Sequence, residues 1–346
     1  MQDQKEVKLL TKRVPWIDIC RGIAILFVLY GHILTADKQH YLIYAFHMPL
    51  FFFLSGIVFK PIMTKPFSFI IKKNVKQLLI PYFIFAILTY FFAIASHTTG
   101  TSNLGGVIWQ LFGMVYGNGN NGMLGYNVVL WFLPCLFITK VTFAFVSRKI
   151  SRIKPLMLFL FGSALSGYVL SIFFPWVKLP FGFESALTGI VFFGCGYLWK
   201  QRAFVLARSK KYKIPVAITT MIFTLIVATI QFRATGYAID LRTNHLGNFF
   251  LFYLAAFGGI ISCITISQIL AKNFFLEYLG SHSMVLFAWH NILFVDLKNF
   301  TQTFVARNFV STITVLMPTL YVFTAMTIIL LSRMMVIKLK EIYPLR

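Results

Sequence analysis

Residues 78–96 read LLIPYFIFAILTYFFAIAS, and this stretch decides the fold class. It contains no Asp, Glu, Lys or Arg, and the uncharged region around it extends from Gln77 to Thr139. A helix needs about 20 mostly apolar residues to cross the hydrocarbon core of a bilayer. The stretch therefore predicts a membrane-spanning helix rather than a helix of a soluble domain.

The rest of the chain has the same character. Of its 346 residues, 58% are hydrophobic and 12% are charged, and the mean hydropathy is +0.78. A soluble domain carries about 25% charged residues because it must cover a wet surface. We therefore expect an all-α integral membrane protein, a single domain with about ten transmembrane helices. The expected spans are residues 17–34, 41–59, 78–96, 127–146, 156–174, 183–199, 214–232, 247–270, 283–298 and 311–336.

One region between two expected spans is ambiguous. Residues 97–127 are too rich in Gly and Asn to cross the membrane. Within them, the apolar segment from Ile108 to Val115 either lies in the membrane interface or re-enters the membrane.

Basic residues set the expected orientation. With the N-terminus inside, 24 of the 32 Lys and Arg residues fall in cytoplasmic segments and 6 fall outside, while Arg21 and Lys140 fall inside predicted helices. Cytoplasmic loops of membrane proteins carry such an excess. We therefore expect both termini in the cytoplasm, with residues 1–16 and 337–346 as tails of a helical bundle formed by 17–336. The formal charge of +23 then reflects the orientation of the protein in the membrane rather than binding of nucleic acid, and no nucleic-acid partner is expected.

The first span carries three ionisable residues, Asp18, Arg21 and His32. Arg21 and His32 are eleven residues apart, about three helical turns, so they share a face to within about 20° and are separated by a rise of about 16 Å. Asp18 lies one turn before Arg21 and can pair with it. Such residues inside a membrane are costly and often functional. The alternative is a boundary ion pair and a histidine that reaches the outer interface. Because these charges interrupt the apolar run, we expect a retained helix rather than a signal peptide.

The second span contains another histidine, His47, two residues before Pro49. Because this span runs antiparallel to the first, His47 is expected at the depth of His32, and the two rings could exchange a proton. With equal weight, His47 is a packing residue beside a proline kink. The neighbouring Ser55-Gly56 favours a close contact between helices.

Three lysines, Lys72, Lys73 and Lys76, precede the third span on the expected cytoplasmic side. Their spacing predicts a face that attracts phosphate, although ordinary positive-inside charge or contact with anionic lipid explains it as well. At the outer end of the sixth span, Glu184 either binds a sugar hydroxyl or faces water, and His290 lies in the ninth span. The sequence contains no metal-ligand spacing, P-loop or G-x-S-x-G, so no metal is expected. The four cysteines lie in predicted spans, which argues against a disulfide framework.

Two runs, WIDICRGIAI at residues 16–25 and FHMPLFFFLSG at residues 46–56, resemble the acyltransferase family 3 membrane proteins, and most closely their fucose 4-O-acetylase-like branch. Arg21 and His32 match the family's R-x10-H motif. The family's basic motif is matched by Lys72, Lys73 and Lys76. Further similarity lies at Pro81-Tyr82, at residues 131–133 and in the run from Leu279 to His290.

The resemblance implies a multi-pass O-acetyltransferase of the bacterial cytoplasmic (inner or plasma) membrane. It would move an acetyl group from cytoplasmic acetyl-CoA, the co-substrate, to a hydroxyl of an extracytoplasmic glycan or lipid-linked saccharide. Some members carry an additional extracytoplasmic esterase-like domain, which we do not expect here. A homo-oligomer or partners in polysaccharide assembly are compatible with this interpretation.

The resemblance also implies roles for individual residues. The phosphates of acetyl-CoA would be held by Arg21, Lys72, Lys73 and Lys76. His32 would deprotonate the acceptor hydroxyl or carry the acetyl group transiently, and Asp18 would orient Arg21. His47 would stabilise the site or relay the proton, with His290 as a weaker candidate. The main alternative is a transporter or exporter of a glycan or lipid, in which the histidines couple protons. A catalytically silent membrane partner of an assembly complex is the third.

Overall fold

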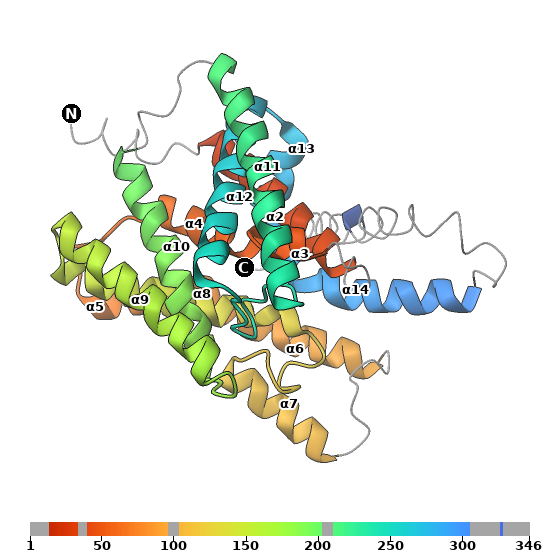
Figure 1. Cartoon of the computed structure of the whole chain (residues 1–346). Coiled ribbons are helices and arrows are strands. Elements are labelled where there is room, and N and C mark those ends of the chain that lie inside the picture. Colours follow the sequence, from red (N-terminus) through yellow and green to blue (C-terminus); the bar gives the residue numbers. More distant parts are fainter. Residues whose placement is uncertain (1–13, 34–39, 96–103, 203–209, 305–325, 328–346) are drawn as a thin grey trace, which may run out of the picture.

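The computed structural model of the protein describes residues 14–33, 40–95, 104–202, 210–304 and 326–327 (Figure 1). Within them every regular element is a helix, and one isolated bridge joins Asp240 to His245. The elements are α2 (Pro15–Ile33), α3 (His40–Tyr44), α4 (His47–Ile57), α5 (Phe67–Asn74), the π-helix η2 (Val75–Leu79), α6 (Ile80–Ala95), α7 (Leu104–Tyr116), the 3-10 helix η3 (Val128–Trp131), α8 (Phe132–Lys149), α9 (Ile153–Phe173), the 3-10 helix η4 (Pro180–Gly182), α10 (Phe183–Arg202), α11 (Lys210–Thr235), α12 (Phe249–Leu270), α13 (Phe274–Ser281) and α14 (Ser283–Phe304).

Among the described residues, 7 helical segments are long and apolar enough to cross a membrane. They are His40–Ile57, Phe67–Ala95, Val128–Lys149, Ile153–Phe173, Pro180–Trp199, Tyr212–Thr235 and Phe249–Leu270, which correspond to the second to eighth expected spans. The first and ninth expected spans form helices as well, α2 and α14. The tenth, 311–336, lies outside the described residues except for Met326 and Thr327. The helical membrane fold is confirmed, while the number of ten spans and the placement of both termini in the cytoplasm stay predictions.

The second expected span is not one continuous helix. It is divided into α3 and α4, and Phe46 at the junction has φ −141°. The reason is Pro49, because a proline ring lacks an N–H and collides with the carbonyl four residues earlier in an α-helix. At the break, the Nδ1–H of His47 donates to the Ile43 carbonyl at 2.9 Å. The break therefore places His47 at the first turn of α4, where its ring takes part in ending α3.

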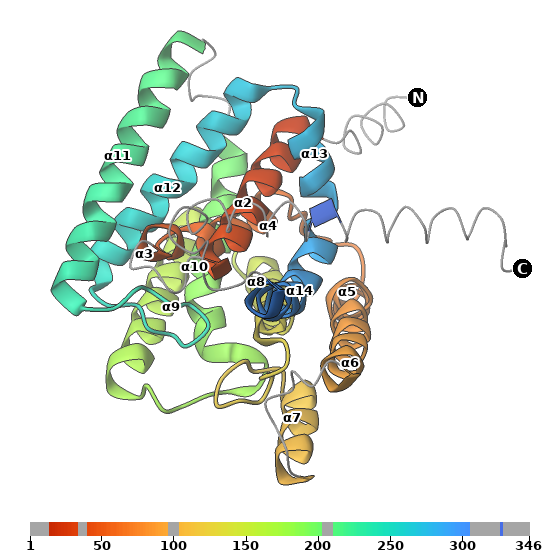
Figure 2. The ribbon, with the colours of Figure 1, turned by 90° about the vertical axis from the view of Figure 1, so that its right-hand side faces the viewer.

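Residues 97–127 contain a helix, α7, where the sequence left two alternatives open. It is 13 residues long, and the Tyr82 hydroxyl donates to the Met114 carbonyl at 2.8 Å, which fastens α7 to α6. Figures 1 and 2 place α7 at one edge of the molecule, below α6. Whether it lies in the interface or re-enters the membrane stays a prediction.

The helices between residues 128 and 270 run alternately up and down, which fixes two ends of the bundle. The loops 117–127, 174–182 and 236–248 meet at the bottom of Figure 1, and we call this the loop end. At the opposite end, which we call the basic end, α8 finishes at Arg148 and Lys149.

Glycines allow helix backbones to touch at two places. Gly56 of α4 faces the Phe193 carbonyl of α10, and a side chain at Gly56 would collide with it. Gly22 of α2 and Gly280 of α13 form the second such contact, because a side chain at Gly280 would collide with the backbone of α2. Small residues let membrane helices approach closely. The predicted close contact at Ser55-Gly56 is confirmed, and it holds α4 and its histidine against the rest of the bundle.

Gly56→Ala should destabilise the protein, whereas Gly162→Ala should not. Alanine is favoured over glycine inside a helix by about 1 kcal/mol, but at Gly56 it meets the α10 backbone, and overpacking costs about 1–3 kcal/mol. A side chain at Gly162 of α9 would meet no atom within 4 Å. Thermal unfolding of the purified protein in detergent measures the difference, and equal midpoints for the two variants would contradict the close contact.

Candidate functional site

A cluster of aromatic and histidine rings forms where α2, α3, α4 and α14 meet. The His32 ring, at the end of α2, lies 5.0 Å from the His290 ring of α14, centroid to centroid. It lies 6.3 Å from the ring of Tyr44, which in turn lies 4.9 Å from that of His47. His47 and His290 are buried and His32 is half-buried. Three histidines thus gather from separate parts of the sequence, as expected of an acid–base site.

The cluster differs from the predicted His32–His47 pair. The ring nearest to His32 among these contacts is His290, which the sequence made only a weaker candidate. Tyr44 contacts both His32 and His47. The break between α3 and α4 explains this, because it turns Tyr44 towards both rings. His47 remains within electrostatic range of His32.

A polar clamp closes the loop end over this cluster. Asn118 donates to the Leu179 carbonyl at 2.9 Å and to Glu184 at 3.0 Å. Asn120 donates to the Arg242 carbonyl at 2.9 Å, and the Arg242 guanidinium donates to Gly119 at 3.0 Å. These bonds tie the three loops of the loop end to one another. The clamp bears on the cluster because Arg242 lies within electrostatic range of His32.

The clamp settles the environment of Glu184, which is 1% exposed. One carboxylate oxygen accepts from Asn118 and the other accepts the Leu179 N–H at 3.0 Å. Glu184 therefore neither faces water nor presents a carboxylate free to bind sugar. Nearby, partial burial lowers the pKa of the Lys178 ammonium, and the Glu184 carboxylate opposes that shift. Lys178 donates to the Thr243 carbonyl at 2.7 Å, which adds another bond between loops.

A second group of charges lies towards the basic end. Arg21 and Asp18 form the predicted ion pair at 3.1 Å, with side-chain exposures of 30% and 13%. Lys140, half-buried on α8, lies within electrostatic range of Arg21 and Lys73. Arg21, Lys73 and Lys140 are thus linked electrostatically through Lys140, and of these three cations Arg21 has a carboxylate partner, Asp18. Unbalanced charge of this kind is costly in a membrane protein. Such a group attracts an anion.

The acyltransferase domain of acyltransferase family 3 matches residues 14–334 of the chain. The chain belongs to the acyltransferase 3 family. No curated protein and no solved structure matches it. The match identifies the chain as a membrane acyltransferase with several apolar spans. It favours acyl transfer over the transporter interpretation.

The acyltransferase 3 chain has one helix that joins its two polar groups. Because α2 is continuous from Pro15 to Ile33, Arg21 and His32 keep the spacing that the sequence predicted, with a rise of about 16 Å. The end of α2 near Asp18 is pressed against α13 at Gly280. The helix therefore holds the anion-attracting group and the histidine cluster at a fixed separation.

The remaining predicted site residues of this acyltransferase are three lysines that precede α6. Lys72, Lys73 and Lys76 are exposed, on the segment where α5 passes through the π-helix η2 into α6. Of these three, Lys73 interacts electrostatically with Lys140. The π-helix widens the turn, so the three lysines do not keep the regular α-helical face that the sequence suggested. From the sequence, Lys140 was noted only as a cation within a predicted span and was not assigned to the site. Its position as a lone charge in an apolar helix is the feature that could have pointed to it.

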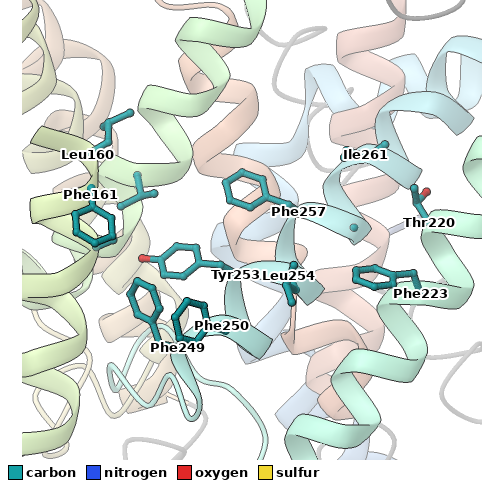
Figure 3. A pocket seen from close by; sticks show the side chains of 13 residues that line it. Leu160, Phe161, Thr220, Phe223, Phe249, Phe250, Tyr253, Leu254, Phe257 and Ile261 are labelled. Atoms are coloured by element: carbon teal, nitrogen blue, oxygen red, sulfur yellow. The ribbon is translucent and has the colours of Figure 1, made fainter. Parts of the chain in front are cut away.

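The acyltransferase 3 chain also has a cleft of about 510 Å³ away from the histidines (Figure 3). Leu160 and Phe161 of α9 form one wall, Phe223 of α11 forms the other, and Tyr253 and Phe257 of α12 lie between them. No ionisable carboxylate, lysine, arginine or histidine lines this cleft. Its lining suits a hydrocarbon chain rather than a phosphate, so we place the chemistry at the histidines and cations.

The described residues of the acyltransferase contain no group of three or more His, Cys, Asp and Glu side chains that could hold a metal ion. The four cysteines are free thiols, three of them buried. Within the described residues, the histidine cluster and the cations around Arg21 are therefore the two groups considered below for the chemistry.

Proposed function

We propose that the protein is an O-acetyltransferase that uses cytoplasmic acetyl-CoA and acetylates a hydroxyl of an extracytoplasmic glycan or lipid-linked saccharide. The observation that carries the proposal is α2, which has a cation group at one end and a histidine at the other. A donor made on one side of the membrane and an acceptor on the other require such a connection. The family membership supplies the acyl-transfer chemistry.

On the donor side, the phosphates of acetyl-CoA are held by Arg21, with Lys72, Lys73 and Lys76 at the entrance. We add Lys140 to this group because it lies within electrostatic range of both Arg21 and Lys73. Asp18 orients the guanidinium through its 3.1 Å ion pair. Arginine and lysine bind phosphate through charge-assisted hydrogen bonds. An apolar stretch of α2 separates these cations from His32, and the pantetheine arm of acetyl-CoA lies along this stretch.

On the acceptor side, His32 removes the proton from the acceptor hydroxyl while the oxygen attacks the thioester carbonyl. The C–O bond forms, the C–S bond breaks, and the departing thiolate receives the proton from His32. In the second version of the step, His32 carries the acetyl group before the hydroxyl receives it. His47, with Tyr44 between it and His32, stabilises the charge of the cluster or relays the proton.

The location and partners follow from the same assignment. We place the protein in the bacterial cytoplasmic membrane, in the fucose 4-O-acetylase-like branch, with the basic end in the cytoplasm. The loop end then faces the acceptor, and Arg242 and the clamp form the surface that the acceptor meets. A homo-oligomer or polysaccharide-assembly partners are compatible with this arrangement.

Membrane vesicles of known orientation test the proposal. Acetyl-CoA labelled in its acetyl group is supplied to either face, and mass spectrometry of glycans from cells with and without the gene identifies the acceptor. We expect label to reach a glycan hydroxyl only when acetyl-CoA is supplied to the basic end. Movement of an unmodified glycan across the membrane, with acetyl-CoA unused, would instead establish the transporter.

A further inference from the structure

His290 lies in an enclosed position in the middle of α14. Its side chain is 0% exposed, and its Nδ1–H donates to the Phe287 carbonyl at 2.8 Å and to the Leu286 carbonyl at 3.2 Å. A carbonyl can only accept, so the proton of the neutral ring is on Nδ1. Nε2 is then a hydrogen-bond acceptor.

Among the described residues, that acceptor has no hydrogen-bond partner, although it is buried. Leaving a buried polar atom unpaired is costly, so such an atom in a native fold needs an explanation. The rings around His290 are Phe287 at 6.0 Å, Phe294 at 5.5 Å and His32 at 5.0 Å. Of these, only His32 can donate a hydrogen bond to Nε2.

The position of His290 is held from outside α14. Asn127, just before η3, donates to the Ala288 carbonyl at 2.7 Å. Phe132 of α8 contacts Phe287 with ring centroids 5.5 Å apart. His32 is half-buried whereas His290 is fully enclosed. His290 is therefore the enclosed ring of the pair, and His32 is the ring with exposed surface that a substrate can reach.

We propose that His290 is a positioning residue, which accepts a hydrogen bond from His32 and thereby fixes the proton of His32 on the nitrogen that faces α14. A centroid separation of 5.0 Å leaves room for one N–H···N hydrogen bond of about 2.9 Å when the ring nitrogens face each other. The inference rests on the proposed function, because it assigns His32 the task of taking a proton from the acceptor.

With this bond in place, the other nitrogen of His32 is unprotonated and faces the acceptor. The acceptor O–H breaks, its proton moves to that nitrogen, and the oxygen forms its bond with the thioester carbon. The C–S bond breaks and the thiolate takes the proton from His32. His290 keeps its own proton throughout, as an orienting group does when it selects the tautomer of a catalytic histidine.

Two variants of His290 separate positioning from packing. His290→Gln keeps an acceptor near Nε2, and His290→Leu fills the space between two phenylalanines without one. Positioning predicts that Leu lowers kcat about 10- to 100-fold, with the KM for acetyl-CoA unchanged, while Gln recovers much of the rate. A packing role predicts the reverse order, because Leu suits the apolar neighbours better than Gln. Phe294→Leu disturbs the packing beside the ring without removing the acceptor, and should keep kcat near the wild-type value.

The full chain in membranes is used for all variants, and thermal unfolding in detergent confirms folding. Should the Leu variant not fold, His290→Met fills the site more adaptably and takes its place. Wild-type kcat in the Leu or Met variant overturns the inference, as does an equal loss in Gln and Leu. Absence of acetyl transfer by the wild-type protein overturns the proposed function instead, so the two failures are distinct.

Discussion

His32→Ala should abolish nearly all acetyl transfer while the protein still folds and inserts. Of the three histidines in the ring cluster, His32 is the half-buried one, and general acid–base catalysis by a positioned side chain contributes about 10²- to 10⁴-fold. We expect kcat in membranes to fall by about this factor, with acetyl-CoA still bound. The measurement is transfer of labelled acetyl from acetyl-CoA to the isolated glycan, normalised to the amount of protein in the membrane.

His245→Gln is the matched control for this experiment. His245 is exposed at the loop end, where its ring contacts Tyr237 at 5.8 Å, and its bridge to Asp240 uses the backbone only. Its replacement should leave kcat unchanged. Near-normal transfer by His32→Ala would show that His32 is not catalytic, and it would contradict the assignment of acyl transfer to the histidine cluster.

Arg21→Ala should weaken the binding of acetyl-CoA more than it lowers kcat. The change removes a charge-assisted contact to phosphate, together with the ion pair that Arg21 forms with Asp18. Hydrogen bonds to charged groups contribute about 1.5–3 kcal/mol, so we expect the KM and the Kd for CoA to rise about 10- to 100-fold. Isothermal titration of CoA into the detergent-solubilised protein measures binding without depending on turnover.

Arg152→Ala distinguishes a site from a general positive field. Arg152 is exposed beside the start of α9, near the basic end, and has no part in the proposed donor group. Its loss should leave the Kd within about twofold of the wild-type value, as expected for a solvated charge. Equal weakening by Arg21→Ala and Arg152→Ala would mean that acetyl-CoA responds to total charge rather than to the α2 ion pair.

The sequence predicted features that depend on neighbouring residues. Hydropathy located the second to eighth spans, because each needs only a run of apolar residues long enough for the bilayer. The Asp18–Arg21 pair and the separation of Arg21 from His32 follow from helix geometry within one segment. Close packing at Gly56 was also predictable, since small residues mark helix contacts in membranes.

Features that join distant segments were not predictable in this way. His290 is more than two hundred residues from His32 in the sequence, and Lys140 is far from both Arg21 and Lys73. Their neighbours depend on how the helices pack, which one periodic pattern does not specify. The division of the second span required knowing that Pro49 would break the helix rather than bend it. Likewise, the sequence left Glu184 either to bind a sugar hydroxyl or to face water, because its partner Asn118 lies 66 residues away in the chain.

Because α2 is continuous, the relative position of Arg21 and His32 depends on how many residues lie between them more than on which residues these are. Exchanging one apolar residue there for another alters packing and leaves both groups where they were. Adding or deleting a single residue rotates His32 by about 100° about the helix axis and moves it about 1.5 Å along it. The ring would then leave His290 while Arg21 stayed with Lys140. The length of this helix therefore sets the distance and the angle between the cations around Arg21 and the histidine cluster. A change in length would misalign them even if every side chain in the site were kept.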